Sequence, residues 1–334
     1  MSVMINANNI TNFLAFAMCL LIFGCAGTKK VSTDEVEQVV DEPTEIPVYE
    51  PSVNYGEIYS SISEPEQLTF GEFDNGIGNI HPDGGRIVYQ SFQEEKWQLY
   101  EKSFSDSLPS LLLDGDYNLE NPIWSTDGSV VLYVQTVKGG SGWDRDIYMY
   151  DPIEEVSARL TTKAGDDWFP VAVDEASYIF ITERDAGEFQ PIDERDNSIY
   201  RGNLDGSEPL LLTDSSNNFS SPAFIDDSRL IVLTAESRLA IYNGETGTSE
   251  IITPSRIECG TCDYNSNSGV VVFSSYGDDS ALFFMDLESK VIQEVTLAGE
   301  GVRYPRFSPD GAWLLYSALH EGNFQLFRIN LTSD

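Results

Sequence analysis

The sequence predicts an all-β fold, a six-bladed β-propeller of four-stranded blades that is closed by an N-terminal strand in the last blade. Three observations lead to this prediction. A short motif recurs six times at blade-sized spacing, and strand-like runs of apolar and aromatic residues follow each copy. The strand that is missing from the last copy is found ahead of the first.

The motif is clearest at residues 304–311 (YPRFSPDG), 121–128 (NPIWSTDG) and 77–84 (IGNIHPDG). Weaker copies begin at residues 169, 221 and 261. Successive copies are 44, 48, 52, 40 and 43 residues apart when measured at the position of the first proline, which is occupied by Gly78, Pro122, Pro170, Pro222, Cys262 and Pro305. Repeats of 40 to 50 residues are typical of propeller blades.

Each copy predicts four strands in the same order. We expect the first strand to begin at the proline, where a missing N–H is tolerated. The Asp-Gly pair then forms a tight turn into an apolar second strand such as VVLY. An aromatic-rich third strand (DIYMYD at 146–151) and a fourth strand (ARLTT at 158–162) complete the unit. A single blade cannot bury both of its faces, so neighbouring blades must cover them.

The ends of the array predict a closed ring. The sixth copy stops after its third strand, near Leu331, whereas residues 66–69 (EQLT) match the fourth-strand pattern of the other copies. We therefore expect the segment around Gln67 to pair with the strand near Leu326, which leaves no open edge. The propeller is assigned to residues 66–334.

The N-terminus resembles a bacterial lipoprotein signal peptide, assigned to residues 1–24. Eleven apolar residues at 13–23 are too few to span a bilayer, and Gly24-Cys25 fits the lipobox, although no Lys or Arg precedes it. The resemblance implies that Cys25 is lipidated, palmitate included, and anchors the protein in a membrane. Residue 26 is Ala rather than the Asp that retains such proteins at the inner membrane, which favours the outer membrane. A buried core helix ending in Gly-Cys is the alternative.

Residues 25–65 are assigned to the lipidated N-terminus and an acidic, disordered tether. From residue 31 to residue 65 there are nine acidic side chains, four prolines and no Lys or Arg. Such a composition is typical of an extended, self-repelling segment.

The overall charge limits the choice of partner. The chain has 55 Asp and Glu against 19 Lys and Arg, a formal net charge of -36, so nucleic acid is excluded as a partner. A basic partner protein, bound divalent cations or adaptation to a salty exterior all remain compatible with this charge.

The repeats resemble those of the TolB C-terminal propeller family, on the motifs YPRFSPDG, NPIWSTDG and NIHPDG. The resemblance covers residues 66–334. The α/β domain that precedes the propeller in that family has no counterpart here, because only the acidic segment occupies its place. Since the TolB propeller binds a peptidoglycan-associated envelope lipoprotein, the resemblance implies an envelope protein or a cell-wall component as the partner.

No catalytic, metal or cofactor site is expected. The only histidines, His81 and His320, fall in turns and lack a second ligand at metal-binding spacing, and no G-x-S-x-G motif is present. The alternative is a propeller enzyme that acts on polysaccharide through carboxylates in its channel. Cys259 and Cys262 form a CxxC pair, which we interpret as a structural disulfide across a turn, with free thiols as the alternative.

The candidate binding surface is the rim formed by the loops that enter each first strand. Aromatic and arginine side chains among polar groups suit a protein interface. Packing of the aromatic residues between blades is the competing interpretation. The predicted binding residues are Asn75, Asn121, Asp167, Trp168, Phe219, Arg303 and Tyr304.

Overall fold

The computed structural model describes residues 50–138, 143–184, 196–276, 280–295, 297 and 300–332. The predicted signal peptide, the predicted lipidation site Cys25 and the tether up to residue 49 lie outside the described residues. Within those residues, no helix has the length and apolar character needed to cross a membrane.

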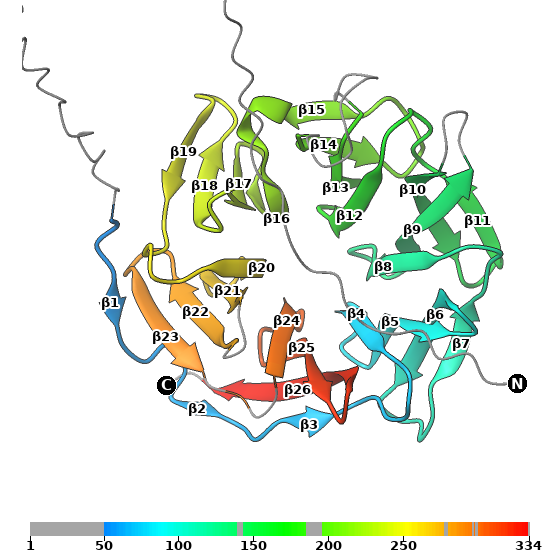
Figure 1. The fold of residues 1–334 in the computed structure, drawn as a ribbon, viewed down its shortest axis with the longest axis horizontal. Helices are drawn as coiled ribbons and strands as arrows, with labels where there is room; N and C mark the ends of the chain where they lie inside the picture. The colour runs from blue at the N-terminus through cyan, green and yellow to red at the C-terminus, as the bar shows by residue number, and fades with distance from the viewer. Residues whose placement is uncertain are drawn as a thin grey trace, which may run out of the picture. The chain divides into compact units, whose positions relative to one another are not determined.

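Six antiparallel sheets form a ring around a central axis, as predicted (Figure 1). In each sheet the first strand is innermost and the chain proceeds outward. Blade 1 comprises β4 (Asn75–Ile80), β5 (Arg86–Gln93), β6 (Lys96–Ser103) and β7 (Ser110–Leu113). Blade 2 comprises β8 (Leu119–Trp124), β9 (Val131–Lys138), β10 (Trp143–Asp151) and β11 (Val156–Arg159). Blade 3 comprises β12 (Asp167–Ala172), β13 (Ser177–Thr182), β14 (Ser198–Asn203) and β15 (Leu210–Thr213).

The second half of the ring repeats this order. Blade 4 follows the short 3-10 helix η2 (Ser215–Asn217) and comprises β16 (Ser220–Asp226), β17 (Arg229–Leu233), β18 (Leu239–Asn243) and β19 (Thr248–Ile251). Blade 5 comprises β20 (Cys259–Asn265), β21 (Val270–Ser275), β22 (Leu282–Asp286) and β23 (Val291–Val295), with β1 (Asn54–Tyr55) at its edge. Blade 6 comprises β24 (Glu300–Phe307), β25 (Trp313–His320) and β26 (Asn323–Thr332), with β2 (Ser61–Ile62) and β3 (Glu66–Gln67) at its edge.

The core lies between the blades rather than within them. Six buried clusters alternate with the six blades, and each cluster draws side chains from two neighbouring sheets. Alternation along a strand produces this arrangement. On β5, Ile87 packs toward blade 6 and Val88 toward blade 2, and both are fully buried. Every blade therefore needs two neighbours, which confirms the ring predicted from the repeats.

The two ends of the array pair in one sheet, as predicted. Gln67 and Glu66 of β3 lie opposite Phe327 and Arg328 of β26, in antiparallel register. The backbone N–H of Leu68 donates to the carbonyl of Leu326 at 2.8 Å. This pairing supplies the fourth strand of blade 6 and closes the ring.

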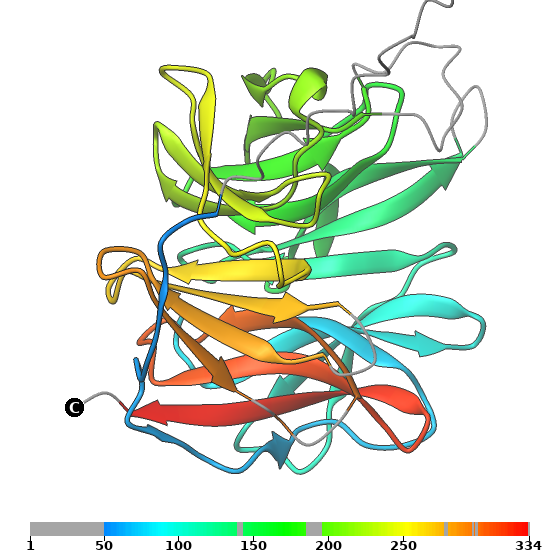
Figure 2. The ribbon, with the colours of Figure 1, turned by 60° about the vertical axis from the view of Figure 1, so that its left-hand side comes forward.

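The predicted end of the tether, at residue 65, is too far along the chain, because ordered strands begin before it. Residues 50–65 do not hang free but form a strap along the outer edges of blades 5 and 6 (Figure 2). Asn54 and Tyr55 pair in parallel with β23, and Ser61 and Ile62 pair with β26. Within the strap, Tyr59 is buried with its ring 4.8 Å from that of Phe284. Outer-strand edges offer hydrogen bonds to any extended segment, so a few apolar residues are enough to hold this acidic stretch in place.

The Asp-Gly turns take the predicted form. The carboxylate of Asp127 accepts a hydrogen bond from the Ser129 N–H at 3.0 Å, and Gly128 has a φ of +73°. His81, in the equivalent turn of blade 1, is a turn residue as predicted. It is buried against Trp124 of blade 2, with 4.7 Å between the ring centroids.

Candidate functional site

A β-bulge near the start of every innermost strand shapes the centre of the ring. In β8 the pairing with β9 skips from Glu120 to Ile123, so Asn121 and Pro122 have no partner in the ladder. The same skip at the motif proline occurs in blades 3, 4 and 6. The first strands of blades 1 and 5 carry a bulge close to this position, at Ile77 and at Gly260 and Thr261. The proline thus lies inside the strand rather than at its start, contrary to our expectation. A bulged residue makes no ladder hydrogen bond, so the missing N–H is tolerated there as well.

In four of the six blades the bulge places one residue in an unusual backbone conformation. The residue before the motif proline has a positive φ of 50° at Asn121, 53° at Phe169, 45° at Ser221 and 54° at Tyr304. A residue with a side chain in this region costs about 1 kcal/mol or more. All four side chains line the central cavity. The backbone is therefore strained at the positions where these side chains turn toward the axis of the ring.

Asp or Asn side chains fix the loops around the cavity in four of the six units. The residue four positions before the motif proline accepts a hydrogen bond from the backbone of the preceding blade. The four bonds are 2.8 to 3.1 Å long. Asp74 accepts from the N–H of Phe324, Asn118 from that of Trp97, Asp166 from that of Arg145, and Asn218 from that of Asn197. These bonds hold the start of the third strand of one blade against the entry loop of the next.

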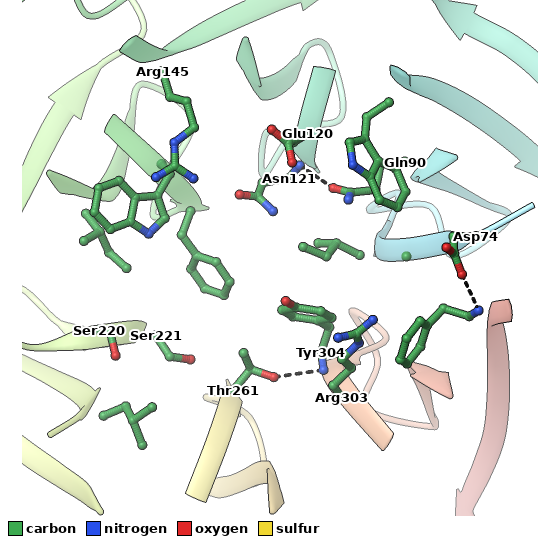
Figure 3. Close-up of a pocket in the computed structure, with 18 of the residues that line it drawn as sticks. Asp74, Gln90, Glu120, Asn121, Arg145, Ser220, Ser221, Thr261, Arg303 and Tyr304 are labelled. Carbon is green, nitrogen blue, oxygen red and sulfur yellow. Dashed lines mark hydrogen bonds between the residues drawn. The ribbon is translucent and has the colours of Figure 1, made fainter. Parts of the chain in front are cut away.

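The resulting cavity has a volume of about 530 Å³ and is lined by residues of all six blades (Figure 3). This is the size of a small-ligand pocket. Six aromatic rings, two arginines and two carboxylates are among the lining side chains. The lining comprises Asp74, Gly76, Ile77, Gln90, Trp97, Glu120, Asn121, Arg145, Trp168, Phe169, Ile181, Ser220, Ser221, Leu233, Thr261, Tyr276, Arg303, Tyr304 and Phe324.

The two arginines of the cavity have different surroundings. Arg145 binds the carboxylate of Asp166 through Nε at 2.8 Å and Nη2 at 2.7 Å, and its guanidinium lies 4.9 Å from the centre of the Trp168 ring. Arg303 stacks instead on Phe324, with its guanidinium carbon 3.3 Å from the ring centre, and forms no ion pair with any residue that the structure describes. Only the charge of Arg145 is balanced by a bound carboxylate.

The cavity also holds a carboxyl group with a raised pKa. Burial raises the pKa of Glu120 above its usual range, and the nearby positive charge of Arg145 opposes this effect. The second acidic side chain of the lining, Asp74, accepts a hydrogen bond from the N–H of Phe324 at 2.8 Å. Neither carboxylate forms an ion pair among the described residues.

Exposed aromatic side chains lie at the end of the blades where the cavity opens. They lie in the loops that enter the first strands and at the hairpins between second and third strands, which are at the same end of the blades as the cavity mouth. Scattered exposed aromatics are ordinary, but several on one face indicate a contact surface. The residues are Phe73, Phe92, Tyr117 and Tyr276, each at least 40% exposed.

Four of the seven predicted binding residues line the cavity, namely Asn121, Trp168, Arg303 and Tyr304. The other three are buried elsewhere. Asn75 donates to the side chain of Gln325 at 3.0 Å, Asp167 pairs with Arg184 at 2.7 Å, and Phe219 packs against Tyr242 between blades 3 and 4. For Phe219, the packing interpretation was the correct one. Binding by the four lining residues stays a prediction.

The predicted disulfide is not formed, and both thiols are free and buried. Cys259 and Cys262 lie on extended strand β20 instead of flanking a turn. Their sulfur atoms have separate partners: Cys259 Sγ donates to the Thr253 hydroxyl at 3.5 Å, and Cys262 Sγ to the Ser221 carbonyl at 3.2 Å. Burial raises the pKa of the Cys262 thiol to about 12, so it stays protonated at neutral pH.

The cavity residues that come from the second and third strands were not predicted from the sequence. Gln90, Trp97 and Arg145 reach the cavity from those strands, where no motif marks them. A signal did exist in the Asp or Asn found four residues before the motif proline, because each fixes the start of a third strand, where Trp97 and Arg145 lie. Among the described residues, no group of three or more His, Cys, Asp or Glu side chains could hold a metal ion.

Comparisons of sequence find no matching family model and no matching curated protein. Solved structures are similar in fold. TolB of Agrobacterium tumefaciens is 18% identical and matches with a TM-score of 0.58, over 84% of this chain and 100% of that one. The fold is a TolB-type β-propeller.

TolB of Acinetobacter baumannii, 20% identical with a TM-score of 0.55, is matched over 69% of this chain, which spans 56% of the length of that protein. This chain is also similar in fold to an enzyme. An oligogalacturonate lyase in complex with manganese is 13% identical, with a TM-score of 0.56, over 86% of this chain and 97% of that one. At these identities the comparisons establish the fold alone.

Proposed function

We propose that this chain is an envelope lipoprotein whose propeller binds a protein or a cell-wall component on the face where the cavity opens. The observation that carries the proposal is the cavity lining, in which every blade supplies a residue and aromatic rings and arginines surround polar groups. Tyr, Trp and Arg dominate the energetically important centres of protein interfaces. The cavity accommodates an inserted segment of a partner, while the exposed aromatics around the mouth contact the partner's surface.

The binding role is tested by affinity capture from solubilised envelopes with the full-length protein. The test variant is the double substitution Trp168→Ala, Tyr304→Ala, which removes two aromatic walls of the cavity. The matched control is Leu108→Ala, Ile153→Ala, which removes two apolar side chains from exposed turns between third and fourth strands, at the other end of the blades. We expect the control to retain the captured partners and the test variant to lose them. Capture of the same partners by the test variant would show that the cavity is not the binding site.

The anchor requires its own test, since it depends on residues outside the described part of the chain. We expect Cys25→Ser to lose incorporation of a palmitate analogue and to leave the membrane fraction. In the unaltered protein, outer-membrane vesicles separated by density should carry the label. A Cys25→Ser protein that stays labelled and membrane-bound would refute the lipid anchor.

A polysaccharide-acting enzyme is the second candidate, because Glu120 has the raised pKa expected of a general acid and lies in the cavity. Its test is the release of new reducing ends or unsaturated ends from acidic and neutral polysaccharides, measured for the unaltered protein and for Glu120→Gln. Turnover by the unaltered protein that is abolished in the variant would favour the enzyme over the binding role.

A further inference from the structure

Arg303 differs from every other arginine in the described part of the chain, because its guanidinium has neither a hydrogen bond nor an ion pair. The Nε atom is buried without a partner. Three arginines hydrogen-bond to uncharged oxygens: Arg238, Arg256 and Arg306. Seven bind carboxylates: Arg86, Arg145, Arg159, Arg184, Arg201, Arg229 and Arg328.

The protein holds this guanidinium in place without satisfying it. The ring of Phe324 lies 3.3 Å from its central carbon, and the ring of Tyr304 lies at 5.5 Å. Aromatic faces fix the plane of a guanidinium but accept no ordinary hydrogen bond from its edges. The donors at the edge are left for a group that arrives from the cavity (Figure 3).

This arrangement lowers the stability of the folded protein, which indicates that it serves a function. Partial burial of a charged group without hydrogen bonds is unfavourable, and burial lowers the pKa of Arg303 below its usual value. A chain with 55 acidic side chains does not lack carboxylates that could have paired with it. Asp74, a cavity carboxylate whose charge acts on Arg303, accepts a hydrogen bond from the N–H of Phe324 instead. Local departures of this kind are expected at functional sites.

We propose that Arg303 is a carboxylate-binding residue, and that it recognises a carboxylate at the end of, or on a side chain of, a polypeptide segment inserted into the cavity. This inference rests on the proposed binding function. The planar fork of a guanidinium matches a carboxylate with two parallel hydrogen bonds. A phosphate would bring more negative charge next to Asp74 and Glu120, which a single arginine does not offset. The side chain of Asn121 in the same lining offers further hydrogen bonds to an inserted chain.

The test uses full-length protein in detergent and a random heptapeptide library with free carboxyl termini. Recovered peptides are resynthesised in two forms, one unchanged and one in which the C-terminus is amidated and every Asp and Glu is replaced by Asn and Gln. Affinities of both forms are measured by calorimetry. We expect the unchanged form to bind roughly 10- to 100-fold more tightly, the range for hydrogen bonds to a charged group.

Arg303→Met should remove this preference, so that both peptide forms bind alike. Arg303→Lys should keep part of it, because the charge remains and the fork is lost. The matched control is Arg256→Met, which removes an exposed guanidinium 4.6 Å from the ring of Tyr55, outside the cavity lining. The control should keep the full preference. Since the Arg303 guanidinium donates no hydrogen bond to the described part of the chain, its removal leaves no acceptor there unpaired, and thermal unfolding should show the variant folded.

Two results would overturn the inference. If both peptide forms bind the unaltered protein equally, or if Arg303→Met keeps the preference, Arg303 does not read a carboxylate. In either case the proposed binding function is retained if the double variant Trp168→Ala, Tyr304→Ala binds the peptides more weakly than the unaltered protein. If the library yields no binding peptide at all, the proposed binding of a polypeptide fails, and the inference fails with it.

Discussion

The carboxyl group of Asp146 is expected to make the protein less stable as the pH rises, which is the reverse of the usual behaviour of an acidic side chain. Asp146 lies on β10 with no exposed surface, and it binds Arg159 at 2.7 Å. Burial raises the pKa of Asp146 to about 6, against 3.8 for a free Asp, and the Arg159 charge only partly offsets it. A shift of about two pH units corresponds to about 3 kcal/mol.

The sign follows from proton binding. Between pH 3.8 and about 6 the folded state holds a proton on Asp146 that the unfolded state has lost. The free energy of unfolding therefore falls as the pH rises through this window. The loss amounts to roughly half of the full value at pH 5 and is complete, at about 3 kcal/mol, by pH 8.

Asp146→Asn isolates this effect, because the amide has the shape of the protonated acid and does not titrate. Arg159 would lose its carboxylate, but its side chain is 38% exposed and water can solvate it. Urea unfolding of the variant and of the unaltered protein at pH 5, 6, 7 and 8 measures the difference. We expect the variant to be the more stable protein, with an advantage that roughly doubles from pH 5 to pH 8.

The control is Asp310→Asn, whose carboxylate has the opposite shift. Hydrogen bonds from the Ser308 hydroxyl at 2.6 Å and from the Ala312 N–H at 3.0 Å lower the pKa of Asp310. Its stabilising effect is fully present above pH 3.8, so this variant should be less stable by the same amount from pH 5 to pH 8. If Asp146→Asn instead gave a constant difference, or was the less stable protein at pH 8, the ion pair with Arg159 would outweigh the cost of burial.

Three further substitutions or treatments test the fold. Cys259 and Cys262 should not react with a thiol reagent in the folded protein and should both react after denaturation, whereas a disulfide would leave them unreactive throughout. Gly128→Ala should destabilise the protein to urea by well over 1 kcal/mol, because φ is +73° and a Cβ would overlap the His81 ring; an unchanged midpoint would contradict that packing. Tyr59→Ala should cost roughly 3 kcal/mol in urea unfolding if the strap is part of the core, and nothing if residues 50–65 are a free tether.

The repeats and the ring closure could be predicted because both depend on local patterns. An apolar run such as VLYV at residues 131–134 has side chains buried on both faces, and an Asp-Gly pair specifies its own turn. The bulge could not be predicted in the same way. A proline is compatible both with the start of a strand and with a bulge inside one, so Pro122 alone does not distinguish them.

The strap shows a different limit of the sequence. Its acidic composition predicts disorder, yet Tyr59 is buried against Phe284, a residue more than 200 positions away. Composition reports what a segment can bury by itself. It does not report that the edges of β23 and β26 lack a neighbour, which depends on how the whole ring closes.

The formal charge of -36 and the unpaired Arg303 together suggest how the cavity would select its partner. A surface with many negative charges repels acidic partners at long range, and salt screens this repulsion. Inside the cavity, the distance is short and the Arg303 guanidinium is partly shielded from water, so its attraction for one carboxylate persists. A polyanion is therefore disfavoured before contact, whereas a partner with a single carboxylate at the tip of its inserted segment gains the full benefit of Arg303. Specificity then comes from the difference between the long-range repulsion and the short-range attraction. The attraction stays available because no carboxylate among the described residues pairs with Arg303.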